Sequence, residues 1–216
     1  METQIVLERR ARERPRLRYT SIGARRIAGI LALVLSAQFM IVIMLAASIA
    51  PGYDYHGGAI SDLGVVPETA LLFNVSLIVV GVLNAISGWL LYWSHRRTWI
   101  LAIFMLAGLG AVGAGLVPLG TSDLHSLFAL AAFVFFNFEA LAGVAILTGP
   151  MRLVSALFGL AGLAFVALMI IGDAGNPAVF GAIGHGGAER MIAFPVMLWL
   201  LALGGYLLGE PGETLA

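Results

Sequence analysis

The chain has 216 residues, of which 60% are hydrophobic and only 11% are charged, whereas ordinary globular domains are about half apolar and about a quarter charged. Its twelve basic residues are balanced by twelve acidic ones, and it contains no cysteine. The composition excludes an ordinary soluble domain, and the lack of cysteine excludes disulfides, thiolate nucleophiles and thiolate metal sites.

Six apolar segments of about twenty or more residues follow one another, and each is long enough to cross a hydrocarbon core roughly 30 Å thick as a helix. They lie near residues 26–50, 70–93, 98–117, 124–148, 151–172 and 188–208. The first is too long for the apolar core of a secretory signal, and Pro51 follows it directly, so we interpret it as a retained membrane helix. The sequence therefore predicts an all-α bundle of six transmembrane helices.

Arginine is distributed unevenly over the connections between these segments. If the six segments cross the membrane in alternating directions, the N-terminal residues and every second connection lie on one side of it. That side carries Arg9, Arg10, Arg12, Arg14, Arg16, Arg18, Arg25, Arg26, Arg96, Arg97 and Arg152, and the other side carries Arg190 alone. Positively charged connections stay in the cytoplasm, so both termini are predicted to be cytoplasmic. We interpret the arginines as topology determinants that contact anionic lipid, and not as a surface for nucleic acid.

The orientation divides the chain into three parts. Residues 1–25 are predicted to form an arginine-rich cytoplasmic tail, residues 26–208 the transmembrane domain, and residues 209–216 a cytoplasmic C-terminal tail. Small residues at helical spacing, such as Gly81 with Gly88 and Ala107 with Ala111, predict seams where transmembrane helices pack closely. Gly108 and Gly110 widen the small face of the third segment.

Few polar residues fall within the spans, and Glu139 is the most unusual of them. It lies about fifteen residues into the fourth segment, where an ionised carboxylate is costly and often functional. One interpretation is a proton-relay or ion-coupling group, with Asn84 and Asn137 along its path. The other is a protonated or hydrogen-bonded side chain, bonded to Asn84 or Gln38, that locks the bundle.

The three predicted extracytoplasmic loops hold most of the candidate chemistry. Each loop contains one histidine, namely His56, His125 or His185. Six carboxylates accompany them on this side: Asp54, Asp62, Glu68, Asp123, Asp173 and Glu189. If these groups converge, three imidazoles and one or two carboxylates would hold a divalent metal such as zinc and leave a position open to activate water. A metal-free alternative, with a histidine as general base assisted by an aspartate, remains open beside it.

Two Ser-Asp pairs in these loops differ in how easily capping explains them. Ser122 and Asp123 directly precede the fourth apolar segment, where a hydroxyl and a carboxylate satisfy the start of a helix. Ser61 and Asp62 precede the second helix by too many residues to cap it, so they are stronger functional candidates.

Asp173 lies at the C-terminal end of the fifth segment, where the helix dipole disfavours a negative charge. Arg190 is the only arginine on this side of the predicted membrane, so we expect the two residues to pair or to share a ligand.

One stretch of the sequence resembles a known family. Pro51-Gly-Tyr-Asp-Tyr, followed by Ile60-Ser-Asp-Leu-Gly and an apolar helix with Phe73-Asn74, is similar to the bacterial and archaeal integral membrane family described as domain of unknown function 998. Glu189-Arg190, followed by Pro195 and Trp199, resembles the end of that family, so the resemblance spans about residues 26–208. It implies a polytopic membrane protein and no established activity.

Three functional hypotheses remain open, and the partners that they imply are the lipid bilayer and a lipid or lipid-linked substrate. The first is a membrane-embedded hydrolase or transferase acting on a lipid or lipid-linked group at the outer leaflet. Its predicted catalytic residues are Ser61, Asp62, Asp123, His125 and Arg190, its substrate-binding residues Tyr53, Tyr55, Asp173 and Glu189, and its metal ligands His56, His125 and His185. The second is a small proton-coupled permease using Glu139. The third is a non-catalytic component for membrane assembly or sensing.

Overall fold

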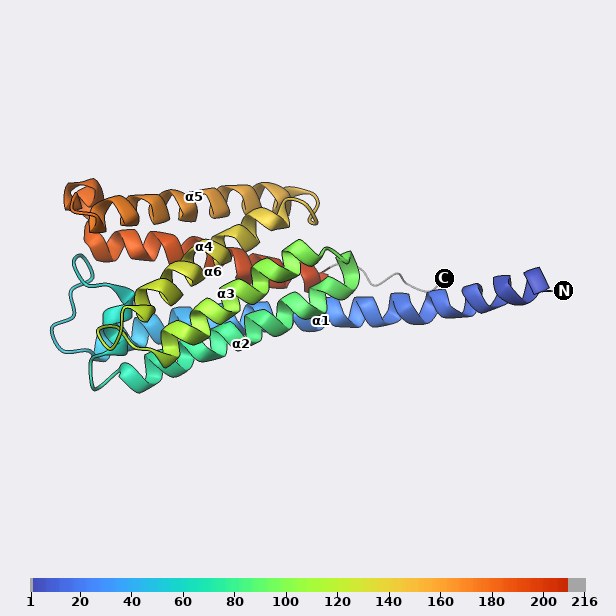
Figure 1. Cartoon of the computed structure of the whole chain (residues 1–216), viewed down its shortest axis with the longest axis horizontal. Helices are drawn as coiled ribbons and strands as arrows, with labels where there is room; N and C mark the ends of the chain where they lie inside the picture. The colour runs from blue at the N-terminus through green and yellow to red at the C-terminus, as the bar shows by residue number, and fades with distance from the viewer. Residues whose placement is uncertain (1, 210–216) are drawn as a thin grey trace.

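The computed structural model describes the backbone of residues 2–209 and the side chains of residues 22–209. This part of the chain forms six α-helices and two short 3-10 helices, and no strand (Figure 1). In chain order they are α1 (Glu2–Ile49), η1 (Ile60–Gly64), α2 (Ala70–His95), α3 (Thr98–Leu116), α4 (Leu124–Gly143), α5 (Pro150–Asp173), η2 (Pro177–Ile183) and α6 (Gly184–Gly209). The side chains of the N-terminal arginines up to Arg18, and residues 210–216 of the predicted C-terminal tail, lie outside the described residues.

Within the described residues, six helical segments are long and apolar enough to cross a membrane, as predicted. They are Ile22–Ile49, Ala70–His95, Thr98–Leu116, Leu124–Gly143, Pro150–Asp173 and Pro177–Gly209. The protein is therefore an all-helical, multi-pass membrane protein.

Three helix boundaries differ from the predicted ones by four residues or more. Helix α1 begins at Glu2 rather than near residue 26, so residues 2–25, predicted as a separate tail, continue the backbone of the first membrane helix. Helix α4 ends at Gly143 rather than near residue 148, because the chain turns before Pro150 begins α5. Helix α6 begins at Gly184 rather than near residue 188, although the segment is rich in glycine. Its first turn is stabilised by the connection between α1 and α2, because the Gly186 N–H donates to the His56 carbonyl at 2.9 Å. This N–H would otherwise lack a partner at the start of the helix.

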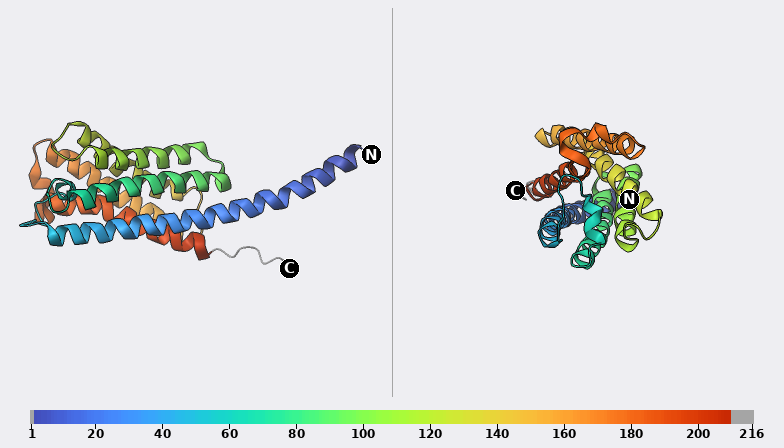
Figure 2. Two further views of the ribbon diagram at one scale, coloured as in Figure 1. Left: turned by 90° about the horizontal axis from the view of Figure 1, so that it is seen from below. Right: turned by 90° about the vertical axis from the view of Figure 1, so that its left-hand side faces the viewer.

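The helices form a ring in which each contacts the next along the chain and α6 returns to α1 (Figure 2). Helix α4 also contacts α6 across the ring. Residues 50–69, 117–123 and 174–183 connect the helices at one end of the bundle, which we name the loop end. Residues 96–97 and 144–149 connect them at the other end, from which α1 projects, and we name it the arginine end.

The helices approach one another closely at the predicted glycine seams. A Cβ atom added at Gly108 would lie 2.6 Å from the Gly81 carbonyl oxygen, and one added at Gly110 would lie 2.5 Å from the Ala132 nitrogen. These glycines bring α2 against α3 and α3 against α4, which confirms the packing role predicted for them.

Candidate functional site

A cavity of about 580 Å³ lies at the loop end between η1, α4, α5 and α6. Its polar lining residues are Ser61, Asp62, His125, Ser126, Asp173, His185 and Glu189. Its larger apolar lining residues are Leu119, Leu130, Phe133, Val166, Met169, Ile170 and Ile192. Except for Leu119, which lies in the 117–123 connection, they are on helices and extend further into the bundle; Phe133, for example, follows His125 on α4 by roughly 12 Å of helix. The cavity is thus polar at its mouth and apolar in its depth, and it is within the size range of small-molecule sites.

His125 presents a free ring nitrogen in this cavity. The residue is 4% exposed, and its Nδ1 lies 2.7 Å from the Val117 carbonyl oxygen. A carbonyl can only accept a hydrogen bond, so Nδ1 carries the proton and Nε2 of the neutral ring is an acceptor. Nε2 is buried and has no partner among the described residues. Because buried polar atoms normally have one, this nitrogen is available to a ligand.

Asp62 has a local role that the sequence did not reveal. Its Oδ2 accepts a hydrogen bond of 2.8 Å from the Ala59 N–H and so caps η1, a short helix that was not predicted. As predicted, Asp62 does not cap the second helix, α2, whose N-cap residue is Thr69; it caps η1 instead. Ser61, the next residue back, also lines the cavity.

The second Ser-Asp pair behaves as a helix start. The Ser122 hydroxyl accepts from the N–H of Leu124, the first residue of α4, at 3.2 Å, whereas Asp123, the N-cap residue, makes no capping hydrogen bond with its side chain. Asp123 is exposed and is not among the residues that line the cavity.

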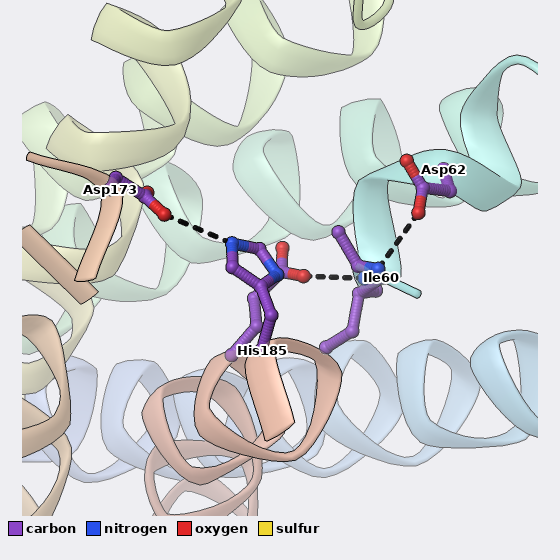
Figure 3. A network of polar contacts seen from close by, with 6 residues as sticks. Ile60, Asp62, Asp173 and His185 are labelled. Atoms are coloured by element: carbon purple, nitrogen blue, oxygen red, sulfur yellow. Dashed lines mark hydrogen bonds and ion pairs between the residues drawn. The ribbon is translucent and has the colours of Figure 1, made fainter. Parts of the chain in front are cut away.

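Asp173 pairs with His185, at 3.2 Å between Oδ1 and Nε2, and not with Arg190 as we expected (Figure 3). Glu189, one turn beyond His185 on α6, is 5% exposed, and its Oε2 accepts from the Ile60 N–H at 2.5 Å. Figure 3 shows Asp173 and Asp62 on opposite sides of His185. The His185 imidazole thus provides the Asp173 carboxylate with a hydrogen-bond partner, which the carbonyl groups at the C-terminal end of a helix cannot provide.

Arg190 has other partners because it points about 100° further around α6 than Glu189. Its Nη1 donates to the carbonyls of Tyr55, Gly58 and Gly186 at 3.1, 3.3 and 2.7 Å. Its Nη2 donates to the Tyr53 hydroxyl at 2.5 Å, and the guanidinium lies 4.8 Å from the centre of the Tyr55 ring. Arg190, Tyr53 and Tyr55 therefore hold residues 53–59 against α6, and none of the three lines the cavity.

Tyr53 completes this clamp by donating from its hydroxyl to the Ala59 carbonyl at 2.7 Å. Burial raises the pKa of Tyr53, although the charge of Arg190 and its hydrogen bond oppose that shift. The hydroxyl consequently stays protonated at neutral pH and serves as a structural hydrogen-bond donor.

His56 lies in the same loop and faces away from the cavity. It is exposed, and its backbone N–H and that of Gly57 each donate to the Asp54 carboxylate at 2.9 Å. These two hydrogen bonds lower the pKa of Asp54. The loop is tightly turned here, and its backbone lies so close to α6 that a Cβ atom at Gly186 would meet the Gly58 and Tyr55 carbonyl oxygens.

The three loop histidines are not brought together by this arrangement. His125 and His185 line the cavity, whereas His56 does not. Among the residues that the structure describes, no group of three histidine, aspartate or glutamate side chains is placed to hold a metal ion. The geometry therefore supports the general-base alternative better than a three-histidine site.

Sequence reasoning missed the apolar part of the cavity. Phe133, Val166, Met169 and Ile192 give no signal in helices that are apolar throughout, because only the three-dimensional arrangement distinguishes a cavity wall from a lipid-facing or packed surface. Ser126, which directly follows His125 and also lines the cavity, was missed as well.

Glu139 lies in the core of the bundle and not in this cavity. It is fully buried, and its Oε1 accepts a hydrogen bond of 2.6 Å from Asn84 Nδ2, one of the two partners that we expected. Gln38, the other, accepts instead from the Ser76 hydroxyl at 2.9 Å. Asn137 donates to the Phe133 and Ile192 carbonyls and so joins α4 to α6.

A family model described as "Protein of unknown function (DUF998)" matches residues 12–206. No curated protein and no solved structure matches the chain.

Proposed function

The chain belongs to this family of proteins of unknown function, and we propose that it is a membrane-embedded hydrolase or transferase acting on a lipid or lipid-linked group in the loop-end cavity. The observation that carries the proposal is the cavity lining, which is polar with a free histidine nitrogen at its mouth and apolar further in. An amphiphilic molecule such as a lipid has a polar group followed by an apolar chain, so its two parts match the polar mouth and the apolar depth of the cavity. From the arginine distribution, we place the loop end on the extracytoplasmic side of the cell membrane and both termini in the cytoplasm.

The charged residues that line the cavity limit the chemical class of the substrate's polar group. Asp62, Asp173 and Glu189 line the cavity, and no arginine is among the described residues around it. Since Arg190 is held by the 53–59 loop and does not line the cavity, we do not propose the catalytic role that we predicted for it from the sequence. The lining favours a hydroxylated or cationic group that donates hydrogen bonds to carboxylates.

His125 Nε2 is the group best placed to act as general base. It can accept a proton from a water molecule, which would give hydrolysis, or from an acceptor hydroxyl, which would give transfer. The Ser61 hydroxyl also lines the cavity and is the candidate protein nucleophile. The Asp173–His185 pair would orient the polar group of the substrate at the mouth.

The test uses purified protein in lipid nanodiscs, incubated with a membrane lipid extract and with a photoactivatable lipid analogue. We expect crosslinks on α4 and α5 at the cavity, and their loss in Ala129→Trp, which fills it. We expect His125→Gln to lower lipid turnover by about 10²–10⁴-fold, the usual contribution of a general base, while crosslinking is retained.

Glu68→Gln is the matched control, because Glu68 is an exposed carboxylate at the same end of the bundle. Unchanged turnover in His125→Gln would overturn the catalytic role. Crosslinks that persist in Ala129→Trp would overturn the binding site itself.

The second candidate function is a small proton-coupled permease, and Glu139 is the observation that favours it. One of its carboxylate oxygens, Oε2, is buried and has no partner among the described residues. However, Glu139 lines a different cavity, which shares no lining residue with the loop-end cavity. A permease would have to join the two cavities by a change of conformation.

A non-catalytic role is less well supported, because five of the predicted loop residues with ionisable side chains converge on one cavity.

A further inference from the structure

Glu139 is one of the residues that line a second cavity, of about 140 Å³, at the arginine end of the bundle, and its Oε2 has no hydrogen-bond partner among the described residues. The side chain is 0% exposed, and the hydrogen bond from Asn84 occupies only Oε1. A buried carboxylate oxygen without a donor is costly unless it carries a proton or meets water. The cavity is large enough for several water molecules.

His95 presents a complementary atom to the same cavity. Its Nδ1 accepts a hydrogen bond of 2.9 Å from the Arg97 N–H, so the proton of the neutral ring is on Nε2. Nε2 is buried and has no partner among the described residues. Two residues that line the cavity therefore carry unsatisfied polar atoms, a donor on His95 of α2 and an acceptor on Glu139 of α4. Ordered water that entered between them would connect the two.

The remaining lining identifies the ligand class. Arg25 of α1 and His95 of α2 are the other titratable groups that face the cavity, Ser94 is its one hydroxyl, and α3 and α6 contribute only apolar side chains. Glu139 is the only carboxylate among the lining residues. A metal cation would need several oxygen ligands, whereas a proton needs one.

We propose that Glu139 is a proton-binding site that exchanges with solution at the arginine end through the cavity it shares with His95. A hydrated proton in the cavity transfers to Oε2, so the carboxylate becomes a neutral carboxylic acid and water remains. Proton binding at Glu139 does not depend on the amphiphile function of the loop end, whereas the permease candidate would require it.

The first experiment labels the reconstituted full-length protein with dicyclohexylcarbodiimide, which modifies protonated carboxyl groups in apolar surroundings, and maps the adduct by mass spectrometry. We expect an adduct on Glu139 that diminishes as pH rises and is unchanged by sodium at constant pH. Glu139→Gln keeps an oxygen for the Asn84 bond and should lose the adduct at this position.

Two outcomes would overturn the assignment. An absence of the adduct at every pH would mean that Glu139 does not bind a proton reversibly. Protection by sodium at constant pH would mean that the site takes a metal cation instead.

The second experiment tests whether protons reach Glu139 from the arginine end. It uses a single engineered thiol, because the chain contains no cysteine of its own. Ser94→Cys places the only thiol in the cavity, and Ser48→Cys places it on α1 near the loop end. The two serines are matched, because both are exposed and each donates to the carbonyl three residues earlier at 2.7 Å.

After modification with a bulky thiol reagent, the carboxylic-acid infrared band of Glu139 is followed after a rapid pH jump. We expect the response to slow several-fold in modified Ser94→Cys and not in modified Ser48→Cys. Equal rates in the two proteins would overturn the proposed route from the arginine end.

Discussion

Arg190 binds backbone carbonyls and a tyrosine hydroxyl of its own chain, and it is only 9% exposed. Its planar guanidinium reaches Tyr53, Tyr55 and Gly58 of the loop at once, together with Gly186 of its own helix. Lysine carries the same charge but lacks this fork of donors. The residue therefore stabilises the loop end through the geometry of its side chain.

Arg190→Lys is expected to destabilise the protein by about 1–3 kcal/mol for each buried acceptor left unsatisfied. Thermal unfolding in detergent measures the loss, and hydrogen exchange should rise in residues 53–59. Arg152→Lys is the control, since Arg152 is exposed at the arginine end. Equal stability of the two variants would show that the clamp contributes nothing.

His125 and Glu139 share one property at the residue scale. Each has one polar atom fixed by a hydrogen bond and another that is buried without a partner among the described residues. In His125 the fixed atom determines which nitrogen is free, and in Glu139 the hydrogen bond from Asn84 leaves Oε2 free. Each residue lines a cavity, which is why these two residues carry the two proposals.

At the scale of helices, close packing depends on particular glycines. A Cβ atom at Gly110 of α3 would lie 2.5 Å from the Ala132 nitrogen and 2.9 Å from the Phe128 carbonyl oxygen, both in the backbone of α4. Backbone atoms cannot move aside as a flexible side chain can. By contrast, a Cβ atom at Gly205 of α6 would meet nothing within 4 Å.

Gly110→Ala is therefore expected to separate α3 from α4 and to destabilise the protein by about 1–3 kcal/mol, the usual cost of overpacking. Gly205→Ala should be neutral or stabilising by about 0.5–1 kcal/mol, because alanine favours the helix more than glycine does. Unfolding in a denaturing detergent compares the two. A Gly110→Ala protein as stable as Gly205→Ala would contradict the packing described for this seam.

At the scale of the whole molecule, the two ends of the bundle differ in their charged residues and in their cavities. The arginine end carries Arg96, Arg97 and Arg152 and the cavity with Glu139, whereas the loop end carries the amphiphilic cavity. If the arginine end faces the cytoplasm, the loop-end cavity opens toward the outer leaflet and the Glu139 cavity toward the cytoplasm.

Engineered cysteines test this orientation. Thr121 is exposed at the loop end and Thr98 is exposed at the arginine end. In intact cells, a membrane-impermeant maleimide is expected to label Thr121→Cys and to label Thr98→Cys only after permeabilisation. The opposite pattern would reverse the proposed topology and with it the side to which each cavity opens.

The sequence by itself determined the helical class, the six spans, the glycine seams and the importance of Glu139. Hydrophobic length and small-residue spacing are properties of consecutive residues, and a lone carboxylate in an apolar segment stands out without any knowledge of its neighbours. The family resemblance was visible for the same reason, since it depends on short consecutive motifs.

Only the tertiary structure decided which loop residues meet. His56 lies outside the cavity that His125 and His185 line, although the sequence did not distinguish the three histidines. It also decided that Arg190 binds the 53–59 loop, that His185 pairs with Asp173, and that His95 lines the same cavity as Glu139. The physical reason is that a residue's direction depends on its angle around a helix and on the path of a loop, which are fixed by packing between segments far apart in the chain.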